Sequence, residues 1–354
     1  MRLFLFLFLM GYSILAYGYG QPDTGKTKPR ISRIIPGRPA SIGIVGDTID
    51  IKTPTRAGSV LMGGGTDVDE AFKWMISRSG GGNVVIIRAS GTDDYNTYVD
   101  SLGKVSSVET LKIDSRDLAN NDTVARFIRN AEMLFIAGGD QSNYMKYWKG
   151  TKTMAAINYL LNVKHVPVGG TSAGCAIMGG FYYSGEYESL TSGPALANPY
   201  DTLLRVYDND LLQAPFLNHV ITDQHYVTRS RQGRHVAFLS RIIKDKNIYA
   251  DGIASDEKTA VCIDENGKAI VLGKSKAYFL ITDPKKSPET CEPNKPLNWN
   301  YKQQAIRVYE LPGAANENSS GSFDVTAFNI NKAMGGKWYW WWVDNGVLKQ
   351  KEVK

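Results

Sequence analysis

Between about residues 57 and 282, apolar runs of strand length alternate with stretches whose apolar residues recur at helical spacing. The first run, 59–62, ends in three glycines, after which Thr66 can cap a helix. The apolar positions of that helix recur every three or four residues: Val68, Ala71, Phe72, Met75 and Ile76. This alternation predicts an α/β domain in which helices flank a mostly parallel sheet.

Further runs continue the pattern. Strands are predicted at 83–89, 109–113, 133–137 and 166–168, and helices at 123–130, after 141 and at 153–162. Two of these strands lead into glycine-rich turns, around Gly138 and Gly170. Open α/β sheets place their sites at the carboxyl ends of parallel strands, so we expect the site where these two turns meet.

The pattern changes to strands and turns beyond about residue 263. Strands are predicted at 268–272, 277–281 and 306–311, and Asn266-Gly267 and Asn345-Gly346 predict hairpin turns. We therefore expect a core domain at 57–282 and a β-rich C-terminal extension at 283–354. The aromatic segment 337–342 is interpreted as a packed hairpin in preference to a carbohydrate- or polymer-binding platform.

The N-terminus has the features of a secretory signal. Met1-Arg2 precedes an apolar run at 3–10 and small residues up to about residue 20. The sequence predicts a signal peptide at 1–20, a leading segment at 21–56, and a secreted or periplasmic protein. No later run of 18 or more apolar residues occurs, so we expect no stable membrane anchor.

Composition narrows the classes of function. The 41 Lys and Arg residues are scattered among 35 acidic residues. A net charge of +6 distributed in this way is a weak argument for nucleic-acid binding. With three cysteines and four histidines, we expect no disulfide scaffold, no metal site and no cofactor. Cys175 is expected to pack as a small apolar group, and the sequence leaves open whether Cys262 and Cys291 form a disulfide.

The sharpest local motif is Gly170-x-Ser172-x-Gly174, directly between a strand and an apolar helical run. This context is typical of a nucleophile elbow, where small flanking residues allow a tight turn that exposes the serine hydroxyl. The helix N-terminus then directs N–H groups at a developing oxyanion. The alternative is an ordinary glycine-rich turn that binds an anion.

A nucleophilic serine needs a base, and four histidines are available. His165 and His219 begin strands, so each should lie at the end of its strand remote from Ser172, about 20 Å away for His165. His235 lies in an amphipathic stretch, which is compatible with a position at the surface. His225 follows a strand-like apolar run and is the best candidate for the base.

Four motifs, in this order and at similar spacing, resemble those of cyanophycinase and related S51 peptidases over about residues 59–282. They are Gly138-Gly139-Asp140-Gln141, Gly170-Thr171-Ser172-Ala173-Gly174, Asp223-Gln224-His225-Tyr226 with Arg229, Arg231 and Arg234, and Gly252-Ile253-x-x-Asp256-Glu257-x-Thr259-Ala260. The resemblance implies a flavodoxin-like or class I glutamine amidotransferase-like core. It also implies a catalytic triad of Ser172, His225 and Glu257.

The residues alone do not separate Glu257 from the adjacent Asp256 as the triad acid. The expected oxyanion donors are the N–H of Ala173 and one from Gly139 or Asp140. Serine at the nucleophile position, where the related amidotransferases have cysteine, argues against glutamine-dependent amide transfer. Cys175 and the pair Ala254-Ser255 depart from the usual family residues, which leaves the substrate and the rate open.

The resemblance implies a peptide or polymer substrate, because the relatives cleave aspartyl peptides and cyanophycinase hydrolyses β-aspartyl-arginine units. Arginines can anchor a substrate carboxylate with two hydrogen bonds. The expected contact residues are Gln141, Asp223, Gln224, Arg229, Arg231 and Arg234, with Arg229 and Arg231 partly ion-paired scaffold. The alternative function is a secreted, non-catalytic peptide- or polymer-binding protein of the same fold, and a homodimer is left open.

Overall fold

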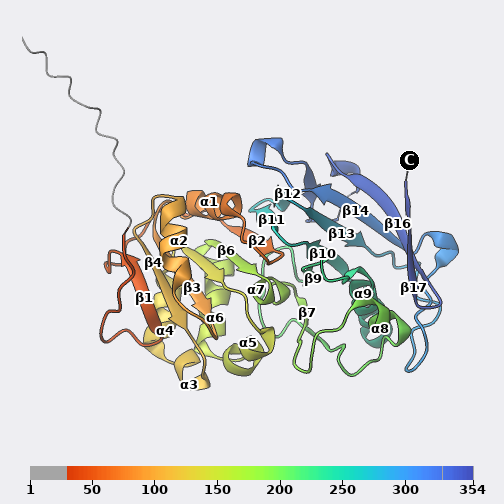
Figure 1. The fold of residues 1–354 in the computed structure, drawn as a ribbon, viewed down its shortest axis with the longest axis horizontal. Helices are drawn as coiled ribbons and strands as arrows, with labels where there is room; N and C mark the ends of the chain where they lie inside the picture. Colours follow the sequence, from red (N-terminus) through yellow and green to blue (C-terminus); the bar gives the residue numbers. More distant parts are fainter. Residues whose placement is uncertain (1–29, 329, 354) are drawn as a thin grey trace, which may run out of the picture.

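The structure, a computed structural model, describes residues 30–328 and 330–353. The expected signal peptide at 1–20 therefore lies outside the described residues. The described chain forms two large sheets that lie side by side along the long axis of the molecule, with helices around them (Figure 1). The α/β class and the β-rich C-terminal region predicted from the sequence are confirmed.

The first sheet has nine strands among the described residues. These are β1 (Ser41–Gly46), β2 (Gly58–Met62), β3 (Asn83–Arg88), β4 (Ser107–Lys112), β5 (Met133–Ile136), β6 (Pro167–Thr171), β11 (Thr259–Asp264), β12 (Lys268–Gly273) and β15 (Ser322–Asp324). Their order is β1-β4-β3-β5-β6-β2-β11-β12-β15. The segment from β4 to β2 is parallel, and β1 and β11 pair with its two edges antiparallel. Strands β12 and β15 continue the sheet from β11 in further antiparallel pairs.

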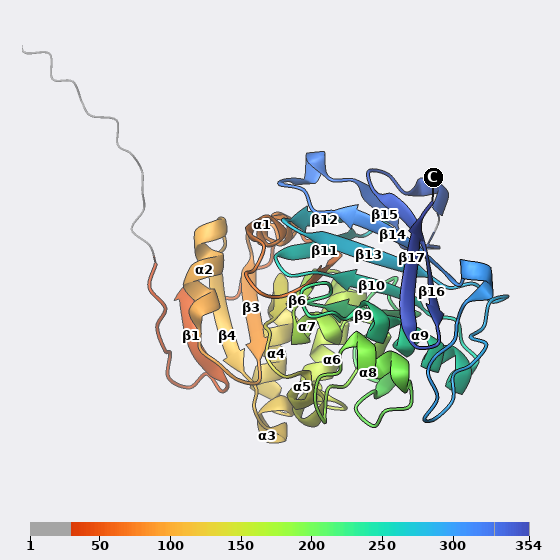
Figure 2. The same ribbon diagram turned by 45° about the vertical axis from the view of Figure 1, so that its right-hand side comes forward.

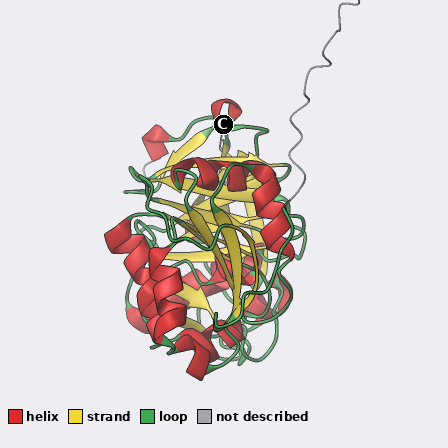
Figure 3. Ribbon diagram, turned by 90° about the vertical axis from the view of Figure 1, so that its left-hand side faces the viewer, coloured by secondary structure: helices red, strands yellow, loops and turns green. Residues whose placement is uncertain are grey.

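Helices cover both faces of the parallel segment, as its continuously apolar strands require. They are α1 (Asp69–Arg78), α2 (Asp94–Leu102), α3 (Arg116–Ala119), α4 (Asp122–Asn130), α5 (Gln141–Trp148) and α6 (Lys152–Tyr159), which continues into a π-helical turn, Leu160–Lys164. Helices α1 and α2 pack on one face, and α3 to α6 pack on the other. Figure 3 shows helices on both sides of the strands.

The second sheet has eight strands in the described part of the chain. They are β7 (Phe181–Tyr183), β8 (Val206–Asp208), β9 (Val220–Gln224), β10 (Asp251–Ser255), β13 (Lys276–Ile281), β14 (Ile306–Pro312), β16 (Lys337–Asp344) and β17 (Val347–Glu352). Their order is β17-β16-β14-β13-β10-β9-β7-β8. Helices α8 (Ser192–Ala197) and α9 (Gln232–Lys246) pack on its outer face, beside β9 and β10 (Figure 2).

The inner face of the second sheet packs against the antiparallel end of the first. Phe279 and Tyr309 of the second sheet share a cluster with Val261 and Val271 of the first. The chain crosses between the sheets in the turn from β10 to β11. That turn, the end of β9 and the end of β6 therefore come together at the seam between the two sheets.

Several boundaries differ from the sequence-based expectations. Strand β1, in the leading segment 21–56, pairs with β4 and belongs to the first sheet. The C-terminal strands extend both sheets, so the segment 283–354 is no separate layer. Helix α1 begins at Asp69 after an uncapped Val68, so the expected cap at Thr66 is wrong.

The C-terminal segment forms the predicted hairpin. Asp344 pairs with Val347, and Asn345 and Gly346 both have positive φ, as a two-residue turn requires. Trp341 and Trp342 are buried. All three cysteines are free and buried, so Cys262 and Cys291 form no disulfide. No helix of residues 30–328 and 330–353 has the length and apolar character needed to cross a membrane.

Candidate active site

Ser172 lies in a strained turn between β6 and the short helix α7 (Ala173–Ala176). Its φ is 51° and its ψ is −113°, a combination that non-glycine residues rarely adopt. A Cβ on Gly170 would come 2.5 Å from the Gly174 carbonyl carbon, and a Cβ on Gly174 would come 2.2 Å from the Ile136 oxygen. Only glycine therefore fits at either flank, which is the geometry of a nucleophile elbow.

His225 follows the carboxyl end of β9 and faces Ser172 across the seam. Its Nε2 lies 2.8 Å from the Ser172 Oγ. The backbone is again in the left-handed region, with φ of 49°, and its N–H donates to the Gly63 carbonyl at 2.8 Å. The second sheet thus supplies an imidazole, fixed by backbone contacts, to a serine of the first.

Glu257 and Asp256 occupy the turn from β10 to β11, and they have different partners. The Glu257 Oε1 lies 2.7 Å from the His225 Nδ1. The Asp256 carboxylate accepts hydrogen bonds from the N–H groups of Val227 and Thr228 and from the Ser275 hydroxyl. Burial alone would raise the pKa of Asp256, but these hydrogen bonds outweigh it and hold the pKa below its usual value.

Burial of His225 favours its neutral form. Burial lowers the pKa of His225, the hydrogen bond with Glu257 opposes this, and the positive charges of Arg229 and Arg231 lower it further. Arg229 Nε lies 3.6 Å from the Glu257 Oε1. A neutral imidazole with Nδ1–H directed at Glu257 presents a free Nε2 lone pair to Ser172.

The turn after β2 is part of this site, a role that its local sequence pattern does not predict. A Cβ on Gly64 would come 2.4 Å from the His225 Cε1, and a Cβ on Gly65 would come 2.9 Å from the Glu257 Oε2. Both glycines have positive φ. The sequence signal for this role is the run of three consecutive glycines, 63–65, at the carboxyl end of a strand.

The turn after β5 borders Ser172 from the other side. A Cβ on Gly138 would come 3.3 Å from the Ser172 Cβ. Asp140 caps α5, because its Oδ1 accepts a hydrogen bond from the Ser142 N–H at 2.9 Å. The turn after β5 therefore approaches Ser172 at Gly138, and Ala173 at the start of α7 follows Ser172 directly.

Of the expected substrate contacts, Asp223 and Arg234 are occupied with each other. Arg234 donates from Nε and Nη2 to the two carboxylate oxygens of Asp223, at 2.9 and 2.5 Å, and each side chain is 1% exposed. Burial alone would raise the pKa of Asp223, but the Arg234 charge and hydrogen bonds lower it. Because both side chains are buried and bound to each other, neither is free to contact a substrate.

Arg231 and Gln224 are also buried. Arg231 donates to the Gln224 carbonyl at 2.9 Å, and burial, together with the charge of Arg234, lowers the pKa of Arg231 to about 10. Arg229 is different, since its side chain is 52% exposed. Gln141, at the start of α5, is half-buried and lies against Gly185.

The remaining histidines lie elsewhere. His165 precedes β6 and His219 precedes β9, so each is at the end of its strand opposite the site. His235 does not occupy the surface position with which its amphipathic stretch is compatible. It is fully buried between Tyr226 and the Ile221 carbonyl, and burial lowers its pKa to about 4.

Metal-ligating side chains do not cluster: within the described ranges, no group of three or more His, Cys, Asp or Glu residues could hold an ion. Cys175, next to the elbow, packs in the core, and burial raises the pKa of its thiol well above the ordinary value. It is therefore no competing nucleophile.

Comparison with known proteins identifies the family. The profile of Peptidase family S51 matches residues 59–271, more than half of the chain. Cyanophycinases from Trichormus variabilis and from a Nostoc species are each 24% identical over 279 residues, which cover 75% of this chain and 87% of theirs. The solved structure of a peptidase from an acI-B1 Actinobacterium, with 15% identity and a TM-score of 0.48, covers 64% of this chain and 91% of that one.

Proposed function

The chain belongs to peptidase family S51 and is a serine-type peptidase, and we propose that it cleaves aspartyl or β-aspartyl peptide bonds through Ser172, His225 and Glu257. The observation that carries the proposal is the unbroken hydrogen-bonded series from the Ser172 hydroxyl through the imidazole to the Glu257 carboxylate. Adjacent groups in the series are 2.8 and 2.7 Å apart, as a triad requires.

In the first half of the reaction, the Ser172 Oγ attacks the substrate carbonyl while the His225 Nε2 takes its proton. Glu257 holds the Nδ1–H tautomer and stabilises the imidazolium that forms. The N–H of Ala173 and one from Gly139 or Asp140 then stabilise the tetrahedral oxyanion. Collapse of this intermediate breaks the peptide bond, and His225 returns the proton to the leaving amine.

The second half releases the acyl group from Ser172. Water attacks the ester, His225 takes a proton from that water, and the serine hydroxyl is regenerated. Each residue keeps its position through both halves. The strained turn at Ser172 and the backbone contacts of His225 support this, because both side chains are fixed before substrate binds.

The preference for an aspartyl group rests on the positive charge beside the triad. Arg229 is exposed next to Glu257, and the buried Arg231 adds to the positive potential without access to solvent. We infer that Arg229 and Gln141 contact the substrate carboxylate directly, while the buried Asp223, Gln224, Arg231 and Arg234 support the surrounding backbone without direct contact. The known cyanophycinase relatives are consistent with this preference.

We also propose that the protein is secreted or periplasmic, on the basis of the signal-like residues 1–20. Release of the mature chain from residue 21 in an expressing cell, detected by N-terminal sequencing, tests this.

Mass spectrometry of reaction products tests the substrate. The purified protein is incubated with cyanophycin, β-Asp-Arg, β-Asp-Lys and the corresponding α-aspartyl dipeptides. We expect cleavage of aspartyl or β-aspartyl bonds, and no cleavage of matched glutamyl dipeptides, whose side chain is one methylene longer. Equal cleavage of aspartyl and glutamyl peptides, or of unrelated esters, would contradict the preference while leaving the serine mechanism intact.

A further inference from the structure

Arg88, the last residue of β3, carries a positive charge that no acidic residue within the described chain pairs with. Its Nε donates to the Ser90 carbonyl at 2.5 Å, and its Nη1 donates to the Thr92 carbonyl at 2.6 Å. Gly91, between these two carbonyls, has a φ of 101°, and a Cβ there would clash with Nη2. The loop after β3 therefore closes around the guanidinium and fixes its orientation.

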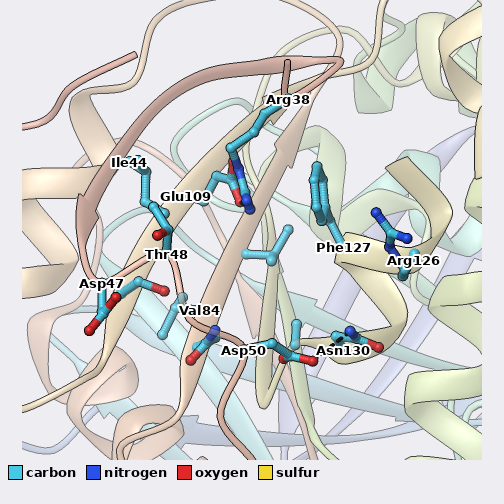
Figure 4. A pocket seen from close by; sticks show the side chains of 14 residues that line it. Arg38, Ile44, Asp47, Thr48, Asp50, Val84, Glu109, Arg126, Phe127 and Asn130 are labelled. Carbon is cyan, nitrogen blue, oxygen red and sulfur yellow. Dashed lines mark hydrogen bonds and ion pairs between the residues drawn. The ribbon is translucent and has the colours of Figure 1, made fainter. Parts of the chain in front are cut away.

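Other arginines of the protein are bound by carboxylates. Arg234 binds Asp223, and Arg38 donates to both carboxylate oxygens of Glu109, at 2.7 and 2.5 Å, in a cavity beside α4 (Figure 4). The carbonyl partners of Arg88 have no net charge and use two of the five N–H donors of its guanidinium. Because Arg88 is only half-buried, its charge and its other three donors are available to a carboxylate ligand.

The carboxyl end of β3 is on the same edge of the first sheet as the nucleophile. In the parallel strands β3, β5 and β6, Ile87 pairs with Ile136, and Ile136 pairs with Gly170. Arg88 is one residue beyond this row, and Ser172 is two residues beyond it. Neighbouring strands lie about 4.8 Å apart, so β3 and β6 are separated by roughly 10 Å.

The loop after β3 approaches the nucleophile through the turn after β5. A Cβ on Gly139 would come 3.7 Å from the Ser90 Oγ, and a Cβ on Gly138 would come 3.3 Å from the Ser172 Cβ. Ser90, whose carbonyl holds the Arg88 guanidinium, thus lies beside the backbone that borders Ser172. Arg88 belongs to the wall of the site on the β5 side of the nucleophile.

The base and its acid are on the other side. The backbone of His225 is bonded to the turn after β2, the strand that pairs with the opposite edge of β6. Arg229 Nε lies 3.6 Å from the Glu257 Oε1, so this second guanidinium is on the β2 side as well. A substrate at Ser172 therefore has one guanidinium on each side, Arg229 toward β2 and Arg88 toward β5.

We propose that Arg88 binds a second carboxylate of the substrate, which makes the peptidase selective for aspartyl dipeptides with two free carboxylates. A β-linked aspartyl dipeptide has one α-carboxylate on each residue, so the scissile bond lies between them. One carboxylate faces Arg229, and the other forms two hydrogen bonds with Arg88. The arginine side chain and one extended substrate residue, about 3.5 Å long, bridge the distance from β3 to β6.

This inference rests on the proposed function, because it concerns the substrate that Ser172 cleaves. The two fail in different ways. If Ser172 is not the nucleophile, Ser172→Ala still cleaves aspartyl peptides. If Arg88 does not bind the substrate, the native protein still cleaves these peptides through Ser172, and only the selectivity described below is missing.

The test compares three substrates: β-Asp-Leu, its C-terminal amide, and its analogue in which the aspartyl α-carboxylate is an amide. Steady-state kinetics of the purified full chain gives kcat/KM for each. We expect the native enzyme to cleave both amides at least about tenfold less efficiently than β-Asp-Leu, mainly through KM, since each lacks one charge-assisted contact. In Arg88→Gln, the disadvantage of one amide should disappear and that of the other should remain. The amide that loses its disadvantage identifies the carboxylate that Arg88 binds.

Arg116→Gln is the matched control. Arg116 Nη1 also donates to two backbone carbonyls, those of Lys146 and Lys149, at 3.3 and 3.1 Å. These carbonyls lie at the C-terminal end of α5, remote from its start at Gln141 beside the site, so all three kcat/KM values should be unchanged. Circular dichroism and melting temperature verify that each variant is folded.

Two results overturn the proposal. One is equal cleavage of β-Asp-Leu and both amides by the native enzyme, a comparison that needs no variant. The other is a folded Arg88→Gln that loses the same factor on all three substrates or keeps its discrimination against both amides, because Arg88 then only supports its loop. Should Arg88→Gln not fold, Arg88→Lys provides the same comparison. It keeps the charge without the two-bond geometry, so its discrimination against that amide should be reduced.

Discussion

Gly64 lies directly against the imidazole of His225, so closely that a Cβ on Gly64 would come 2.4 Å from Cε1 and 2.5 Å from Nε2. We predict that Gly64→Ala lowers kcat at least about tenfold, because the ring must move away from Ser172 and small misplacements of a catalytic group are costly. The φ of +92° adds backbone strain of about 1–2 kcal/mol. Turnover and melting temperature measure the two effects separately.

Gly37→Ala is the matched control for this substitution. Gly37 also has a positive φ, of 79°, but a Cβ at this position would have no atom of the described residues within 4 Å beyond its chain neighbours. It should therefore lose comparable stability and keep its turnover. If both variants lose turnover equally, strain in the fold explains the effect, and the contact between Gly64 and His225 is unimportant.

The two adjacent acids should respond differently. Glu257→Gln should reduce turnover by roughly a hundredfold or more, because the amide no longer selects the Nδ1–H tautomer. Asp256→Asn should lower the melting temperature by several degrees and turnover less than tenfold, since Asp256 bonds to Val227, Thr228 and Ser275. Steady-state kinetics of the folded variants shows which of the two acids acts in the triad. A much larger loss in Asp256→Asn than in Glu257→Gln means that the two acids exchange roles.

The pH profile should report the lowered pKa of His225. Activity requires the neutral imidazole, so kcat/KM should rise with pH through an apparent pKa below the ordinary 6.5 and then reach a plateau. Arg229→Gln removes a positive charge that disfavours the imidazolium, and should move this limb to higher pH by roughly half a unit. Lys351→Gln, on the exposed edge strand β17, should leave the limb in place. A limb that stays fixed or moves lower in Arg229→Gln contradicts this electrostatic account.

The raised pKa of Asp251 predicts that the stability of the fold depends on pH, independently of catalysis. Burial raises the pKa of Asp251 to about 7. One hydrogen bond, from the Thr282 N–H, opposes this shift without cancelling it. The folded state then binds more protons than the unfolded state between about pH 4 and 7, so this residue's contribution to stability is lost as pH rises through that window. Asp251→Asn should therefore raise the free energy of unfolding by roughly 2–4 kcal/mol at pH 8 and have little effect at pH 4.

Chemical denaturation at both pH values measures this difference. Asp122→Asn is the control, because the Asp122 side chain is 86% exposed and should show no comparable dependence on pH. An Asp251→Asn variant that is equally or less stable than the native protein at pH 8 would mean that Asp251 is ionised there without penalty.

The elbow at Ser172 could be predicted because its requirements are local. Gly170 and Gly174 are needed by contacts within one strand-turn-helix unit, and that unit is visible in the sequence. His225 could be selected by its place at a strand end. The choice between Asp256 and Glu257 depends on the direction of two neighbouring side chains in a turn, which no residue pattern records.

Other features depended on contacts between distant segments. His235 and Arg234 are buried because α9 is covered on one side by the second sheet and on another by α8, although the pattern of α9 predicted a solvated face. The division into two sheets, with the site at their seam, arises from long-range pairing such as that of β2 with β11. Local periodicity predicts the strands and does not determine which strands pair.

Intact-mass analysis after treatment with a fluorophosphonate tests the central claim most directly. The account predicts one stoichiometric adduct on Ser172 in the native protein, no adduct in Ser172→Ala, and labelling slowed by about a hundredfold or more in His225→Ala, since a general base contributes that much to nucleophilic attack. An adduct on another residue, no adduct at all, or unchanged labelling of folded His225→Ala would contradict the assignment of Ser172 and His225 as nucleophile and base.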